Sequence, residues 1–164
     1  MRRSGASVAA LGIALLTGCI YGFAGGGLPP NIHSVAVVPF DNDTPSPNVQ
    51  SELATQLSKE VESRLGLRPA SESRADAVVR GRITRFDVGI PVAYSSQPNV
   101  TSAQREVRIT VDVEILDQVS GRVIWTRKGL VGSGTYSERD EDSGRKAAET
   151  KIVNDIIAGA QSQW

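Results

Sequence analysis

Residues 106–117 read Glu-Val-Arg-Ile-Thr-Val-Asp-Val-Glu-Ile-Leu-Asp, and this stretch decides the fold. Apolar side chains stand at every second position from Val107 to Ile115, and charged or hydroxyl side chains stand between them. A period of two is that of a β-strand, in which successive side chains point to opposite faces of a sheet. One face of this strand is therefore expected to be buried and the other to face water.

The segments around this strand predict the rest of an antiparallel arrangement. Residues 117–121 (Asp-Gln-Val-Ser-Gly) are typical of a short hairpin connection, and residues 122–132 predict the returning strand. Upstream, residues 75–88 alternate in the same way, and a change of phase after Arg85 predicts a β-bulge. Residues 89–103 have no core pattern, so we expect a polar loop or a hairpin tip there.

The remaining regular elements are one buried strand and two amphipathic helices. Residues 33–40 include four consecutive apolar residues, which is typical of a strand buried on both faces. Apolar residues at helical spacing predict a helix that begins at Pro47, with Ser46 as its N-cap and Gly66 at its end. A second apolar stripe, after a polar loop, predicts a helix over residues 144–163.

The order β-α-β-β-β-α predicts an α+β protein. A sheet whose strands alternate between apolar and polar side chains must bury only its apolar face. The two amphipathic helices are the elements that can cover this face. We therefore expect a two-layer sandwich with a four-stranded, mixed or largely antiparallel sheet and both helices on one face. The opposite face is expected to be polar and open, and its predicted residues are Arg80, Arg82, Thr84, Arg108, Thr110, Asp112 and Glu114.

The N-terminal segment has the pattern of a bacterial lipoprotein signal. Two arginines precede an apolar run that is too short to span a bilayer as a stable helix, and small residues lead to Cys19. Residues 16–19 (Leu-Thr-Gly-Cys) resemble the signal in which the cysteine thiol is acylated and becomes the new first residue. Cys19 is the only cysteine in the sequence, so it has no disulfide partner there. An ordinary signal peptide that contains a cysteine is the alternative.

This pattern divides the chain into a signal peptide (1–18), a lipidated tether (19–31) and a single α+β domain (32–164). Glycines make the tether flexible and a proline pair stiffens its exit. The expected diacylglycerol and N-acyl chains on Cys19 would anchor the protein permanently, because two or more acyl chains bind stably. Ile20, rather than aspartate, after the cysteine favours the outer membrane by resemblance to the sorting rule of enteric bacteria.

Composition and charge favour binding over catalysis or nucleic-acid recognition. Without the signal peptide, the chain has 16 basic and 18 acidic residues, so its net charge is 16 − 18 = −2. A nucleic-acid-binding domain is usually basic, so this charge does not favour nucleic-acid binding. His33 is the only histidine, and no second histidine or free thiol is present to complete a metal or acid–base set. No serine lies in a Gly-x-Ser-x-Gly elbow. We expect no catalytic residue, no metal and no cofactor beyond the covalent lipid.

Arginine side chains on the open face are the candidate ligand-binding residues. Arg80, Arg82 and Arg108, together with Arg105, form an arginine-bearing face in this prediction. Guanidinium groups bind phosphates through two parallel hydrogen bonds, and lipopolysaccharide is the phosphate-bearing ligand of an outer membrane. The alternative is a solvated face with cross-strand ion pairs, because acidic residues of the 106–117 strand share it.

Several features of the mature chain occur together in one known family: Cys19 with Tyr21 and Phe23, Pro29-Pro30, the run Val35–Phe40, Asn42 and Thr44, Ala75–Gly81 and Gly121–Trp125. In these features the chain resembles the lipopolysaccharide-assembly lipoproteins. The resemblance implies a lipoprotein on the periplasmic side of the outer membrane that is the partner, or plug, of a large lipopolysaccharide-inserting β-barrel. It also implies the same order of strands and helices. The family's ligand-contacting positions form no motif that aligns here.

Two other function classes remain open. A strand that ends in Pro-Phe-x-Asn is also seen in curli-type secretion lipoproteins and in the amino-terminal domain of the Tol-system translocation protein. An oligomeric curli-type secretion channel would need a segment that forms membrane strands of about 9–11 residues, and residues 89–103 are polar and interrupted by proline. An envelope hydrolase would need an acid–base cluster that the sequence lacks.

Overall fold

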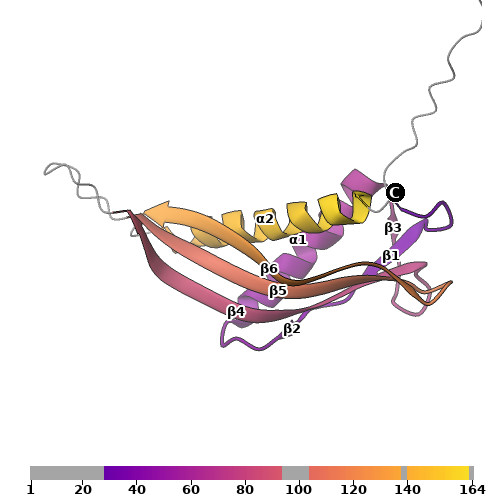
Figure 1. Cartoon of the computed structure of the whole chain (residues 1–164), viewed down its shortest axis with the longest axis horizontal. Helices are drawn as coiled ribbons and strands as arrows, with labels where there is room; N and C mark the ends of the chain where they lie inside the picture. The colour runs from indigo at the N-terminus through magenta and orange to yellow at the C-terminus, as the bar shows by residue number, and fades with distance from the viewer. Residues whose placement is uncertain (1–27, 94–103, 138–139, 163–164) are drawn as a thin grey trace, which may run out of the picture.

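The computed structural model describes residues 28–93, 104–137 and 140–162, and these residues form an α+β structure. In chain order its elements are β1 (Ser34–Val37), β2 (Asp41–Asn42), α1 (Pro47–Leu65), β3 (Arg68–Pro69), β4 (Ala77–Ala93), β5 (Gln104–Asp117), β6 (Arg122–Ser137) and α2 (Glu141–Gln161). The three long strands curve, and both helices lie on the concave side of the sheet (Figure 1). The predicted signal peptide and Cys19 lie outside the described residues.

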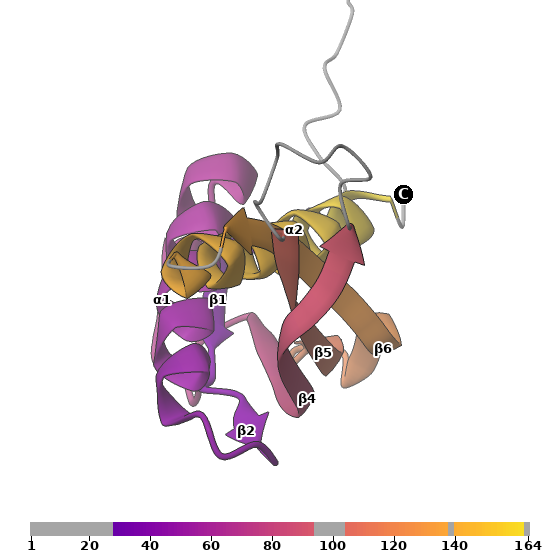
Figure 2. The same ribbon diagram turned by 90° about the vertical axis from the view of Figure 1, so that its left-hand side faces the viewer.

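The sheet is mixed, as predicted, but the prediction of four strands is wrong. The described residues form six strands, in the order β3-β1-β4-β5-β6, with β2 also paired to β4. β1 runs parallel to β3 and β4, whereas β4, β5 and β6 are antiparallel neighbours. The two additional strands, β2 and β3, have two residues each, which is too short to show alternation in the sequence. The strong twist that right-handed strands produce is visible in Figure 2.

Two strands extend beyond their predicted ends. β4 continues to Ala93 and β6 continues to Ser137, into segments expected to be loops. These ends pair with β5, so backbone hydrogen bonding holds them although the segments lack a regular apolar pattern. The predicted bulge is confirmed, because the register between β4 and β5 shifts between Ile83 and Arg85. A further shift follows between Asp87 and Ile90.

The main core fills the space between the helices and the sheet. Its buried β5 residues are those that the alternation predicts: Val107, Ile109, Val111, Val113 and Ile115. The helices contribute Val49, Leu53, Leu57 and Val61 from α1, and Ala148, Ile152, Val153, Ile156, Ile157 and Ala160 from α2. Phe40 is fully buried beside Gly81, where a Cβ atom would lie 2.5 Å from the phenyl ring. The absence of a side chain at Gly81 thus makes room for Phe40.

The helix ends follow from the local sequence. α1 begins at Pro47 and ends before Gly66, whose φ of 66° is the left-handed conformation that stops a helix, as predicted. Ser46 occupies the predicted N-cap position, but its side chain makes no capping hydrogen bond. α2 begins at Glu141, earlier than predicted, because the Asp140 side chain accepts a hydrogen bond from the Ser143 N–H. Among the described residues, no helix has the length and apolar character needed to cross a membrane.

The face of the sheet opposite the helices is open only in part, which corrects the expectation of a wholly open face. At one end, Ala36, Ala75 and Val78 form a second buried cluster, with Val38 and Ala70 packed against it. Residues 70–76, which connect β3 to β4, supply two members of this cluster. The open part is the remainder of β4, β5 and β6.

Candidate functional site

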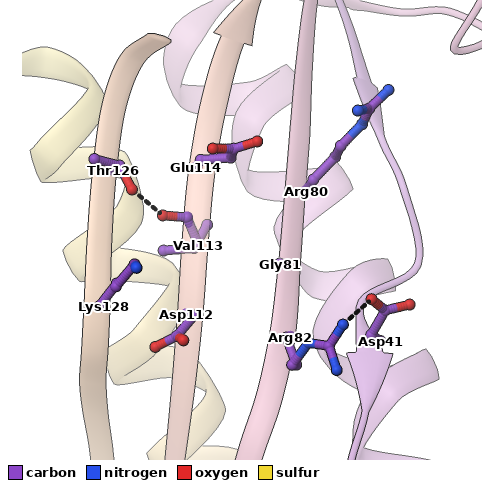
Figure 3. A pocket seen from close by; sticks show the side chains of 9 residues that line it. All are labelled: Asp41, Arg80, Gly81, Arg82, Asp112, Val113, Glu114, Thr126 and Lys128. Atoms are coloured by element: carbon purple, nitrogen blue, oxygen red, sulfur yellow. Dashed lines mark hydrogen bonds and ion pairs between the residues drawn. The ribbon is translucent and has the colours of Figure 1, made fainter.

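A shallow hollow of about 220 Å³ lies on the open part of the sheet, and we call it the open-face trough (Figure 3). Residues of three neighbouring long strands and of β2 line it: Asp41, Arg80, Gly81, Arg82, Asp112, Val113, Glu114, Thr126 and Lys128. Most of its polar side chains are charged.

Strand register explains why these side chains lie together. Arg80 is opposite Glu114 and Arg82 is opposite Asp112 across β4 and β5, and Glu114 is opposite Thr126 across β5 and β6. Because every second residue of a strand points to the same face, basic groups line up along β4 and acidic groups along β5. Figure 3 shows Lys128 on the far side of this acidic row, on β6.

The two arginines of the trough form ion pairs with segments that flank it. Arg80 Nη2 lies 2.6 Å from Glu72 Oε1, which belongs to the segment covering the end of the sheet. Arg82 Nη2 lies 3.0 Å from Asp41 Oδ2, and its Nη1 lies 3.2 Å from Asp43 Oδ1. Both arginine side chains remain about half exposed, at 48% and 51%. These pairs connect β4 to β2 and to residues 70–76.

Arg108 lies on the same face but outside the trough. It is four residues along β5 from Asp112, which is a separation of about 13 Å at the usual rise of a strand. Its Nη2 lies 2.7 Å from Glu106 Oε1 on the same strand. The structure therefore brings two of the three predicted ligand-binding arginines together and separates the third.

Arg105 does not belong to the open face, contrary to the prediction. It lies two residues before buried Val107 on β5 and is paired in register with Tyr136, whose side chain is buried. Alternation therefore directs Arg105 to the helix side of the sheet.

The sequence from residue 32 to residue 159 matches the family model described as lipopolysaccharide-assembly (LptE). The chain belongs to the lipopolysaccharide-assembly family. The match covers both helices and the sheet, so the predicted family is confirmed. No curated protein sequence matches the chain significantly.

Several solved protein structures have the same fold as this chain. The PelC dodecamer from Paraburkholderia phytofirmans is 19% identical, with a TM-score of 0.55 over 83% of this chain and 93% of that chain. A putative neuraminyllactose-binding hemagglutinin homologue from Helicobacter pylori is 16% identical, with a TM-score of 0.50 over 85% of this chain and 87% of that chain. At these identities the likeness is one of fold.

The trough gives this member of the lipopolysaccharide-assembly family a surface with charges of both signs. Asp112 Oδ1 accepts a hydrogen bond of 2.7 Å from the Gly129 N–H, while Glu114 and Lys128 form no ion pair with any described residue. Exposed ion pairs are worth about 0–1 kcal/mol, so the arginines can exchange their carboxylates for a phosphate at little cost. The surface suits ligands that carry phosphate together with amine or hydroxyl groups.

Sequence reasoning missed the partners of these arginines. Asp41 is 41 residues from Arg82 in the sequence, and Glu72 lies in the irregular segment before β4, so no periodic pattern indicates their contacts. Lys128 was missed because the bulge near Gly129, whose φ is 64°, changes the phase of β6. Within the described ranges, no group of three or more histidine, cysteine or acidic residues is arranged to hold a metal ion.

A second polar group lies on the other side of the molecule, between the helices. Glu149 of α2 is only 2% exposed, and its Oε1 has no hydrogen-bond partner among the described residues. Burial, with a smaller contribution from neighbouring Glu52, raises the pKa of Glu149 to about 7. Glu52 itself pairs with Arg145 at 3.0 Å. The signal for Glu149 is present in the sequence, since it is in phase with the apolar stripe of α2.

Proposed function

We propose that this protein is an outer-membrane lipoprotein, anchored through acylated Cys19 on the periplasmic side, that supports assembly of a lipopolysaccharide-exporting β-barrel. The match of the lipopolysaccharide-assembly family to residues 32–159 carries the proposal. In this proposal the protein acts by binding and not by catalysis, and it uses no cofactor beyond its covalent lipid. The domain fills or braces the lumen of the barrel.

The open-face trough supports this mode of action. The interior of a membrane β-barrel is polar, so a plug needs a polar contact surface rather than an apolar one. The trough offers basic groups on β4 and acidic groups on β5, which can meet lumen side chains of either sign. The same arginines suit the phosphates of lipid A, to which we assign a transient contact.

Purification of the tagged protein from outer membranes tests the proposal. We expect an outer-membrane β-barrel protein and lipopolysaccharide to co-purify with it, and palmitate to label the wild-type chain but not a Cys19→Ser variant. Recovery from envelope extracts without an enriched barrel protein would contradict the assembly role. Absence of palmitate from the wild-type chain would contradict the anchor.

A ring-forming secretion subunit is the second candidate. The PelC structure, which has the same fold, is a dodecamer. An oligomeric secretion channel of the curli type would likewise contain many copies of one chain. Native mass spectrometry after extraction in mild detergent separates the two candidates. A complex of one copy with a barrel protein supports the first, and a large homo-oligomer supports the second.

A further inference from the structure

The tether enters the domain at one end of the sheet, and Leu28 is packed there against the main core. Together with Leu28, the neighbouring side chains Val61, Leu65 and Ile156 line the same small apolar space. If Cys19 carries the lipid, only residues 19–27 lie between the lipid and this contact. Nine residues span at most about 30 Å, so this end of the domain, which we call the tether end, stays close to the bilayer.

The tether end also presents the most exposed large apolar side chain among the residues that the structure describes. Val119 is 70% exposed, at the turn between β5 and β6. Register places this turn beside the tether, because Asp117 is opposite Ala77 in β4 and Ala77 is opposite Val35 in β1. Figure 1 shows β1, β3 and the β5–β6 turn at the same end of the molecule.

The turn that carries Val119 is held rigidly. The Asp117 carboxylate accepts hydrogen bonds from the Val119 N–H at 2.8 Å and from the Ser120 N–H at 3.0 Å. The Asn31 side chain, at the exit of the tether, is close enough to contribute to the lowered pKa of Asp117, after the larger effect of the Ser120 hydroxyl. Gln118 Nε2 donates to the carbonyl oxygens of Glu72 and Ala75, at 2.6 and 3.1 Å. Because the hydrogen bonds already order this turn, burial of Val119 against a partner costs little conformational entropy.

The tether end presents several exposed arginines. Arg68, Arg74 and Arg122 are exposed, and none of them forms an ion pair with another described residue. Three carboxylates of this end are engaged: Asp117 in its own turn, Asp76 with the N–H groups of His33 and Ser34, and Glu72 with Arg80 of the trough. The available donors are therefore guanidinium groups, which bind phosphate in a bidentate manner.

We propose that the tether end lies on the phospholipid headgroup layer, with Val119 inserted at the interface and Arg68, Arg74 and Arg122 bound to lipid phosphates. The inference rests on the proposed lipid anchor at Cys19, because the short tether supplies the high local concentration that makes weak contacts effective. The contact fixes the orientation of the domain. In this barrel-free state, which would precede contact with a barrel, the far ends of β4, β5 and β6 point away from the bilayer. The face that carries the open-face trough is then oriented sideways.

A fluorescent probe on Val119→Cys tests the contact in the full-length lipidated protein. Cys19 is acylated in this setting, so the introduced cysteine is the only free thiol. Matched controls are Val92→Cys at the far end of β4 and Val131→Cys on β6, which replace side chains that are 45% and 41% exposed. Each labelled protein is reconstituted into phospholipid vesicles that contain lipids with a nitroxide on the headgroup.

We expect the probe at position 119 to be quenched at least about threefold more than the probes at 92 and 131. Replacing Arg68, Arg74 and Arg122 together by glutamine should reduce that difference, while circular dichroism checks that the fold is retained. Equal quenching at the three positions, in protein that floats with the vesicles, would overturn the contact but not the anchor. Protein that fails to float would overturn the anchor, and the proposed contact with it.

Discussion

At the scale of single residues, Asp76 ties the start of β1 to the start of β4. Its Oδ2 accepts hydrogen bonds from the N–H groups of His33 and Ser34, at 3.0 and 2.9 Å, and from the Ser34 hydroxyl at 2.7 Å. These bonds favour the ionised carboxylate and therefore hold the pKa of Asp76 below its usual range. One side chain thus links two segments that are far apart in the sequence.

The Asp76→Asn variant should be less sensitive to acid than the wild type. A carboxyl whose folded-state pKa is lowered from 3.8 stabilises the fold above that pH, and this contribution is lost as pH falls through the folded-state pKa. We expect the variant to be less stable than the wild type at pH 6, with a smaller difference at pH 3. Urea unfolding at both pH values measures this. Glu62→Gln, at an exposed carboxyl that forms no ion pair with a described residue, is the control and should show no such convergence.

Glu149 has the opposite pH dependence. Its pKa is raised from 4.5 to about 7, so the folded chain holds a proton that the unfolded chain releases between these values. Stability should therefore fall as pH rises from 4.5 to 7. Glu149→Gln removes the cost and should stabilise the protein by roughly 1–3 kcal/mol at pH 8 and by nearly nothing at pH 4. Thermal unfolding at the two pH values checks this, with Glu62→Gln as the exposed control; an equal gain at both would contradict the assignment.

The arginines of the trough should act together on lipopolysaccharide, and Arg108 should act separately. Because a charge-assisted hydrogen bond contributes about 1.5–3 kcal/mol, replacing both Arg80 and Arg82 by alanine should lower photo-cross-linking to lipopolysaccharide at least about tenfold. Arg108→Ala should have a smaller effect, since that side chain lies outside the trough. Arg64→Ala on α1 is the control. Unchanged cross-linking after all three substitutions would exclude these arginines as the contact.

At the scale of elements, the sequence predicts what depends on local pattern and misses what depends on distant pairing. The alternation of β5 and the stripes of both helices are visible along the chain, because each element buries one face. β2 and β3 exist only because β4 and β1 lie beside them. The same distinction holds for the site: alternation placed Arg80 and Arg82 on the open face, but nothing local indicated their partners Glu72 and Asp41.

The contact between α2 and β6 depends on small residues. A Cβ atom at Gly134 would overlap the carbonyl oxygen of Gly144 and would lie 2.6 Å from the Ala147 Cβ. Gly134→Val should therefore push α2 off the sheet and destabilise the protein by about 2–4 kcal/mol. Thr135→Val, at an exposed neighbour on the same strand, should change the free energy of unfolding by less than about 0.5 kcal/mol. Urea denaturation of both variants provides the test, and similar stabilities would show that α2 can move at no cost.

At the scale of the whole molecule, the two faces of the sheet differ in what covers them. The helices cover the concave face of the sheet, and the main core lies between the two layers. The outer face is left to the trough and to the cover formed by residues 70–76. The tether enters at one end of the long strands, so in the proposed membrane-anchored state the domain presents its outer face sideways along the membrane. A barrel partner anchored in the same membrane would meet that face.

A bulky charge in the trough should therefore disrupt the proposed complex with a barrel more than the same charge on the helical layer. Thr126 lines the trough on β6, and Thr55 is an exposed threonine on α1, so Thr126→Arg and Thr55→Arg introduce the same group on opposite sides. A long cation placed in a packed contact costs more than about 1.4 kcal/mol, so Thr126→Arg should lower the co-purified barrel protein at least tenfold while Thr55→Arg leaves most of it bound. Both variants should unfold at the wild-type temperature, because neither side chain is in the core. Equal loss from both would mean that the barrel surrounds the domain evenly, and the open face would then have no special part in the contact.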